Sequence, residues 1–171
     1  MIDMEGKSFT CTLRGECDND NTQGPHLHEI DYQRNARDRE GGWLVLGSRA
    51  DELLHLHFTF IGDYPNGMQY EIRCVGGEYD GAMLGISRNQ YVGFYSVASV
   101  TELWTINLVP LEGGPDLEQN EFDFILQDGR GWSVRSQLRE PWAHMPQHGI
   151  DFLTVEDQMP MILRGKILSF D

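Results

Sequence analysis

Two His-x-His pairs are the residues of this chain best suited to bind a metal: His26 with His28, and His55 with His57. Side chains two positions apart on a strand point to the same face, so each pair offers two imidazoles together. Four imidazoles suit zinc, and the corresponding function is a His-rich, metal-dependent β-barrel enzyme. The favoured interpretation is simpler. The histidines lie on the solvent side of two strands, because the neighbouring glutamates are wrongly spaced to complete a metal site.

Other catalytic chemistry finds little support in the sequence. The chain has no Gly-x-Ser-x-Gly motif, no cysteine in a recognisable setting with a histidine, and no carboxylates paired at a defined distance. Its glycine-rich stretches lack the lysine and the helix that a phosphate-binding loop requires. We therefore expect no catalytic residues, no cofactor and no enzymatic activity.

The three cysteines, Cys11, Cys17 and Cys74, form no metal-type Cys-x-x-Cys pair. Cys11 and Cys17 can pair in an oxidising compartment, but free thiols are the favoured interpretation.

The charge of the chain limits its partners. Aspartate and glutamate number 27 against 13 lysines and arginines, which gives a formal net charge of −14. A negative field repels phosphate backbones and anionic lipids, so nucleic acids and membranes are poor candidates. The N-terminal residues have no signal-peptide pattern, and no apolar run approaches the ~20 residues that span a bilayer. The chain as written is expected in the cytoplasm, with a mature secreted form as the alternative.

Short apolar runs separated by turn residues indicate an all-β fold. Residues 70–109 contain four such runs at about ten-residue spacing, broken by Gly, Asp and Asn. Residues 53–61 alternate large apolar side chains with His55, His57 and Thr59, as in a half-buried strand. Residues 63–67 (DYPNG) predict a turn, because Pro presets φ and Asn-Gly tolerates positive φ.

The same four-run cadence precedes and follows the central stretch. Four runs in each of three sets predict twelve strands and an internal period of about 50 residues. Twelve strands in three units without helices are the pattern of a β-trefoil, in which six strands form a barrel and six form a hairpin cap. We expect residues 1–171 to form one domain, with units at about 1–65, 66–117 and 118–171.

Two motifs in the middle unit carry a family resemblance. Residues 80–84 (DGAML) resemble the Asp-Gly-x-x-Leu opening of ricin-B-type lectin repeats. Residues 102–104 (ELW) resemble their Gln-x-Trp closing motif, with Glu in place of Gln. The third unit repeats the opening at Asp128-Gly129 without the closing Trp, and the first unit has neither motif. The chain thus resembles ricin-B-type and fungal β-trefoil proteins.

The resemblance implies a lectin-type module that binds a neutral glycan or a glycoprotein. In such units an aspartate accepts hydrogen bonds from sugar hydroxyls and an aromatic ring covers the apolar face of the sugar. The opening motif assigns these bonds to Asp80 with Gly81. Tyr95 would supply the ring, with Phe94 as the alternative register, and Thr101 stands where the family has asparagine.

The third unit matches this site less well. Asp128 has the opening position, but Leu153 falls where the ring should be, unless Trp142 reaches the site from its loop. Both Asp80 and Asp128 also have a structural interpretation, since Asp-Gly between two apolar runs is a common two-residue hairpin turn. Trp104 is expected in the core.

A second function for the same fold is protease inhibition. Fungal β-trefoils include Kunitz-like inhibitors, in which a rigid barrel presents one loop to a protease, and a loop that is already ordered binds more tightly. Residues 15–25 and 138–149 are the candidate loops, with ordinary variable surface loops as the alternative. A lectin of the expected kind would depend on Asp80, whereas an inhibitor would not.

Overall fold

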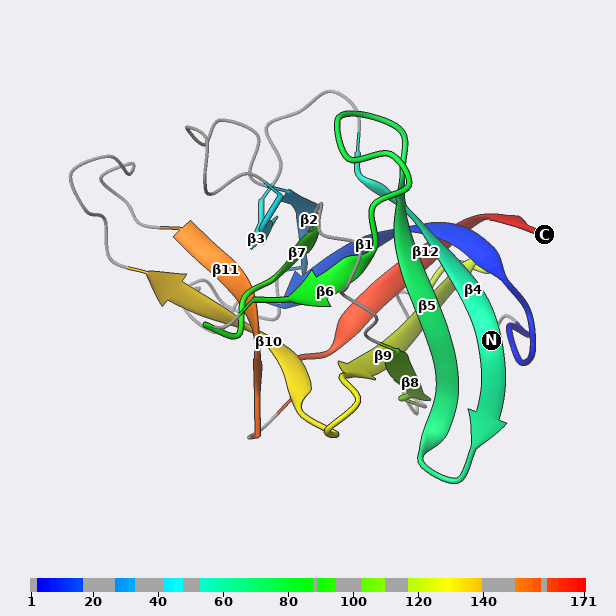
Figure 1. Ribbon diagram of the computed structural model, residues 1–171. Helices are drawn as coiled ribbons and strands as arrows, with labels where there is room; N and C mark the ends of the chain where they lie inside the picture. Colours follow the sequence, from blue (N-terminus) through cyan, green and yellow to red (C-terminus); the bar gives the residue numbers. More distant parts are fainter. Residues whose placement is uncertain are drawn as a thin grey trace.

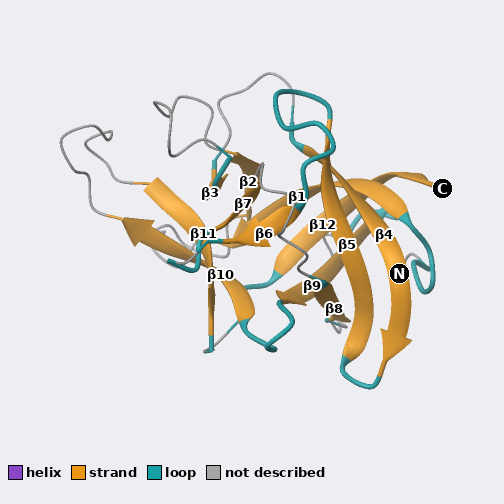
Figure 2. Cartoon of the chain, in the orientation of Figure 1, coloured by secondary structure: helices purple, strands orange, loops and turns teal. Residues whose placement is uncertain are grey.

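The computed structural model is all-β: its described residues contain twelve strands and no helix (Figures 1 and 2). They are residues 3–16, 27–32, 42–47, 53–87, 89–94, 103–109, 117–139, 150–157 and 160–171. The strands are β1 (Phe9–Glu16), β2 (Leu27–Tyr32), β3 (Leu44–Leu46), β4 (His55–Tyr64), β5 (Gly67–Val75), β6 (Leu84–Ile86), β7 (Val92–Phe94), β8 (Trp104–Leu108), β9 (Glu121–Gln127), β10 (Ser133–Arg139), β11 (Ile150–Glu156) and β12 (Leu163–Phe170). This part of the chain has no helix that is long and apolar enough to cross a membrane.

The longest hairpin, β4–β5, shows how local sequence produces these strands. Along β4, Leu56 and Phe58 are buried, whereas His55 is exposed to solvent. The period-two pattern therefore places the apolar side chains inward. The two strands pair from His55 to Tyr64, and Gly67 resumes the ladder opposite Tyr64. The predicted turn at residues 63–67 is therefore present. Only Pro65 and Asn66 lie between the paired strand ends.

Six strands pair in a closed ring. β1 pairs with β4, β4 with β5, β5 with β8, β8 with β9, β9 with β12, and β12 returns to β1, all antiparallel. In Figure 1 this ring occupies the right of the view, with β1 and β12 crossing behind β5. A closed ring leaves few strand edges unpaired, which is how barrels satisfy their backbone hydrogen bonds.

The other six strands form three hairpin pairs, β2–β3, β6–β7 and β10–β11. They gather on the left of Figure 1, beside the ring. β11 also pairs with β3 at Phe152 and Val45, and isolated bridges join Trp43 to Gly93 and Tyr91 to Thr154. The three hairpins thus contact one another although they are far apart in the sequence.

Aromatic side chains fill the centre of the ring. Phe9 stacks on Phe58 with ring centroids 5.0 Å apart, and Phe122 stacks on Phe124 at the same separation. Trp104 is fully buried, as predicted, and its indole N–H donates to the carbonyl of Leu84 at 3.1 Å. This bond satisfies the one polar atom that the largest core side chain carries into the interior.

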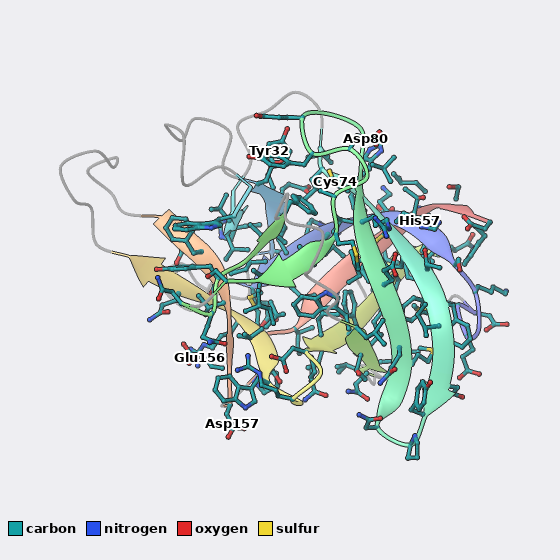
Figure 3. All side chains as sticks on the ribbon, in the orientation of Figure 1. Tyr32, His57, Cys74, Asp80, Glu156 and Asp157 are labelled. Carbon is teal, nitrogen blue, oxygen red and sulfur yellow. The ribbon has the colours of Figure 1, made fainter. Side chains whose placement is uncertain are left out.

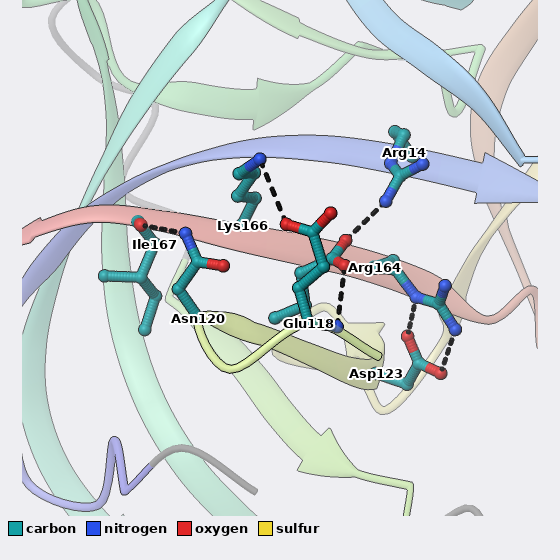
Figure 4. A network of polar contacts seen from close by, with 8 residues as sticks. Arg14, Glu118, Asn120, Asp123, Arg164, Lys166 and Ile167 are labelled. Atoms are coloured by element: carbon teal, nitrogen blue, oxygen red, sulfur yellow. Dashed lines mark hydrogen bonds and ion pairs between the residues drawn. The ribbon is translucent and has the colours of Figure 1, made fainter. Parts of the chain in front are cut away.

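Buried carboxylates of β9 pair with arginines on neighbouring strands (Figure 4). Glu121 is paired with Arg14 of β1, and Asp123 accepts two hydrogen bonds from Arg164 of β12, at 2.8 and 3.0 Å. The side chains of Glu121 and Asp123 are each only 2 % exposed. Because a buried charge must be paired, these contacts fix the order β1–β12–β9 as well as its register.

Cys11 and Cys74 are buried and form no disulfide. Burial raises the pKa of the Cys11 thiol, which keeps it protonated and unreactive. Cys17, the expected alternative partner of Cys11, lies outside the described residues.

Candidate functional site

Asp80 shapes the loop that follows β5. Its Oδ1 accepts a hydrogen bond from the backbone N–H of Gly76 at 2.7 Å, and Gly81 donates to the carbonyl of Cys74 at 2.8 Å. Gly81 has φ of 81°, a conformation that favours glycine. The Asp80 side chain is exposed on this loop (Figure 3). The structural interpretation of Asp80-Gly81 as turn residues therefore has direct support from these bonds.

Phe94, one of the two expected sugar-stacking rings, is 2 % exposed. Tyr79, from the same loop as Asp80, stacks over it with ring centroids 5.9 Å apart, and Tyr32 packs against both rings. Phe94 therefore belongs to the core and offers no ring face to a ligand in this arrangement. Tyr95 and Thr101, the other expected members of this site, lie outside the described residues.

Asp128 is also a turn-builder, and its carboxylate is fully engaged. Oδ1 accepts from the backbone N–H of Arg130 at 2.8 Å and of Trp132 at 3.0 Å. Oδ2 accepts from the Arg130 guanidinium at 2.7 and 3.0 Å. With Asp128 itself 2 % exposed, its chemical effect is to hold Arg130 and Trp132 in place.

The described histidines of the two pairs lie on β2 and β4, two strands that do not pair with each other. On β4, His55 is exposed, and Nε2 of His57 lies 3.0 Å from both carboxylate oxygens of Asp171. The Thr59 hydroxyl lies 3.1 Å from Nδ1 of the same ring. His28 is on β2 and His26 is outside the described residues. Within the described ranges, no three His, Cys, Asp or Glu side chains gather as metal ligands would.

A cleft beside Trp132, lined mostly by polar residues, is the strongest site candidate. It has a volume of about 340 Å³, within the range of small-molecule sites. We call it the Trp132 cleft. It is lined by Asn89, Gln90, Trp132, Gln137, Thr154, Val155, Glu156 and Asp157. Figure 3 places Glu156 and Asp157 at the far end of β11 from Asp80, so this site is separate from the one expected in the middle unit.

One wall of the Trp132 cleft is the turn between β6 and β7. Gln90 has φ of 70°, unusual for a residue other than glycine. The turn is held by Ser87, whose carbonyl accepts from Gln90 N–H at 3.0 Å and whose hydroxyl accepts from Tyr91 N–H at 3.1 Å. The Gln90 carbonyl accepts from Val155 N–H at 3.0 Å, which ties the turn to β11. Strained backbone held this firmly is frequent at binding sites.

Arg130 joins this turn to the opposite wall. Its guanidinium donates to Oε1 of Gln90 at 2.7 Å while it remains paired with Asp128. The same group lies 3.9 Å from the centre of the Trp132 ring, a cation–π contact. Arg130 thus links the Gln90 turn to Trp132 on the cleft lining.

The floor of the Trp132 cleft contains an unsatisfied hydroxyl. Thr154 is 2 % exposed, and its Oγ1 has no hydrogen-bond partner in the structure. Ser136 has a similarly unpartnered Oγ but does not line the cleft. At the rim, Glu156 lies 3.5 Å from Arg135. The lining of the cleft therefore includes a residue whose hydroxyl has no hydrogen-bond partner in the protein.

The sequence did not point to this site. The short segment at residues 89–90 contains no motif. Trp132 follows the Asp128-Gly129 opening, whose carboxylate forms hydrogen bonds within its own turn. A Trp four residues after Asp128 was the only available indication. The protease-inhibitor loops, residues 15–25 and 138–149, fall outside the described residues except for their ends in β1 and β10.

Comparisons with known proteins found no match: no family model, no curated protein and no solved structure is similar to this chain.

Proposed function

We propose that the chain is a β-trefoil module that binds a carbohydrate in the Trp132 cleft without transforming it. The fold part of the proposal is supported by the strand pairing. β1, β4, β5, β8, β9 and β12 close a six-stranded ring, and the three remaining hairpins follow at corresponding places in the chain. A barrel strand, a hairpin and a second barrel strand therefore recur three times.

The lining of the Trp132 cleft suits a polyhydroxylated ligand. A sugar presents hydroxyls that both donate and accept hydrogen bonds, together with an apolar C–H face. The cleft offers carboxamides from Asn89 and Gln137, carboxylates from Glu156 and Asp157, and the indole of Trp132, one face of which Arg130 covers. Amides donate and accept hydrogen bonds in fixed directions and carboxylates accept them, which is the basis of discrimination among sugar isomers.

The single observation that carries the proposal is the Thr154 hydroxyl. A buried hydroxyl without a partner costs about 1–3 kcal/mol, so it is rarely left unsatisfied without reason. Because Thr154 lines the cleft and is 2 % exposed, a sugar hydroxyl that enters the cleft can remove this cost. Binding then gains from a group that destabilises the empty protein.

The test is a glycan-array screen followed by titration, with wild type compared to Thr154→Val. Valine replaces the hydroxyl with a methyl of similar size, so we expect glycan binding to weaken by about tenfold or more. We also expect unchanged or slightly increased thermal stability, because the substitution removes an unsatisfied polar atom. Ser136→Ala is the matched control: it removes the other unpartnered hydroxyl, outside the cleft, and should leave binding unchanged.

Asp80→Ala separates this site from the one that the resemblance implies. Loss of glycan binding in Asp80→Ala, with Thr154→Val unaffected, would move the site to the middle unit and refute our assignment. Absence of glycan binding by folded wild-type protein would refute the carbohydrate proposal itself.

A further inference from the structure

Among the described residues, the Trp132 cleft carries more negative charge than its neighbouring cations match. Glu156 and Asp157 both line it. Two described arginines beside the cleft lining are already engaged: Arg130 with the buried carboxylate of Asp128, and Arg135 at 3.5 Å from Glu156. Asp157 is exposed and forms no ion pair with any other described residue. One carboxylate at the rim is therefore available to a ligand.

The whole chain adds to this local charge. A formal net charge of −14 gives the protein a field that attracts cations and repels anions. A ligand that carries a carboxylate or sulfate is repelled both by this field and by the two rim carboxylates. A ligand that carries an ammonium group is favoured by both.

The charge alone would not indicate a ligand, but the floor of the cleft does. Thr154 lines the cleft, and its buried hydroxyl has no hydrogen-bond partner in the protein, so an occupant with a hydrogen-bonding group gains by reaching it. The amides of Asn89 and Gln137 add further donors and acceptors around it. The occupant is thus expected to combine several hydroxyls with a positive charge on the side that faces Asp157.

We propose that the Trp132 cleft selects sugars that carry a free ammonium group, that is, amino sugars, over their neutral counterparts. This inference rests on the proposed carbohydrate-binding function and specifies the class of sugar. The hydroxyls of the ring contact the floor and the amides, while the ammonium group replaces one hydroxyl near Asp157 and Glu156. Uronic acids are excluded by the same two carboxylates.

The experiment measures dissociation constants for matched sugar pairs: glucosamine with glucose, galactosamine with galactose, and mannosamine with mannose. The titrations are followed by the indole N–H resonance of Trp132, assigned with Trp132→Phe, at about pH 6, where the amine is protonated. For at least one pair we expect the amino sugar to bind about fivefold more tightly, the size of an exposed charge pair. The preference should shrink at high salt, because rim charges are screened.

Two substitutions locate the source of the preference. Asp157→Asn should bring the two affinities of a pair close to equality, and Glu156→Gln should reduce the preference in the same direction. Glu78→Gln is the matched control, because it removes one exposed negative charge on the loop that follows β5. It should leave the preference unchanged.

The outcomes distinguish this inference from the proposed function. Equal affinities for amino and neutral sugars, with binding lost in Thr154→Val, would refute the ammonium preference and leave the carbohydrate site intact. A preference that survives Asp157→Asn combined with Glu156→Gln would also refute it. No binding of any sugar by folded protein would refute both proposals.

Discussion

Neutralising Asp123 tests whether the buried ion pairs of β9 hold the ring together. Asp123→Asn preserves the shape of the side chain but removes its charge. Arg164 then keeps its positive charge but loses the Asp123 carboxylate, at a position where its side chain is 13 % exposed. It also loses two charge-assisted hydrogen bonds, at 2.8 and 3.0 Å.

The expected cost follows from this geometry. Breaking a buried pair by removing one partner costs about 3–5 kcal/mol, because the other charge remains buried. Arg164 retains a little solvent contact, so we expect about 3 kcal/mol. With a urea m-value of about 2 kcal/mol/M, the unfolding midpoint should fall by about 1.5 M at an unchanged m-value. The assay is equilibrium urea unfolding, which leaves ion pairs unscreened, unlike guanidinium.

Two comparisons make the result interpretable. Asp123→Leu combined with Arg164→Met replaces the pair with apolar side chains and should recover most of the loss. Glu118→Gln breaks the exposed Glu118–Lys166 pair, whose side chains are 65 % and 45 % exposed, and should cost less than about 1 kcal/mol. A loss below about 1 kcal/mol in Asp123→Asn, or a double variant less stable than the single one, would refute the reasoning.

Two further predictions concern the β4–β5 hairpin. Gly67→Ala should destabilise the protein by about 2 kcal/mol or more in thermal unfolding, because φ is 134° and a Cβ would lie 2.7 Å from Thr105. Gly76→Ala, with φ of 80° and open space around it, should cost only about 1 kcal/mol, and equal losses in the two variants would contradict the steric explanation. Burial, with a smaller effect of the Asp63 charge, raises the pKa of Tyr70 to about 12, so its phenol stays neutral in the folded protein. An unfolded tyrosine ionises near 10, so stability should be lost as pH rises from about 10 to about 12, and Tyr70→Phe should flatten this part of the pH–stability profile.

The positions of the strands were predictable because they depend on local pattern. Alternation around His55 and His57 marks β4 within two or three residues, and the DYPNG segment marks its turn. Burial of Trp104 followed from its size and apolar surroundings. The buried carboxylates were not predictable: Glu121 and Asp123 follow a Gly-, Pro- and acid-rich segment that suggests solvent, and only the arginines of β1 and β12 make their burial tolerable.

The sequence did not indicate the Trp132 cleft for a related reason. An Asp-Gly motif looks the same in the sequence whether its carboxylate binds a ligand or stabilises its own turn. The Asp128 carboxylate accepts hydrogen bonds from backbone N–H groups of its own turn. The Trp132 cleft forms where Gln90 bonds to Val155 and Tyr91 pairs with Thr154, contacts between separate hairpins. These residues carry no motif of their own.

By itself, the sequence determined the all-β class, the number and approximate bounds of the strands, and the negative charge of the chain. Each of these depends on neighbouring residues or on composition. The tertiary structure alone decided which strands close the ring, which carboxylates are buried, and where a cleft remains. The physical reason is that period-two alternation specifies which face of a strand is buried, but it does not specify which strands pair with it or which side chains pack against that face.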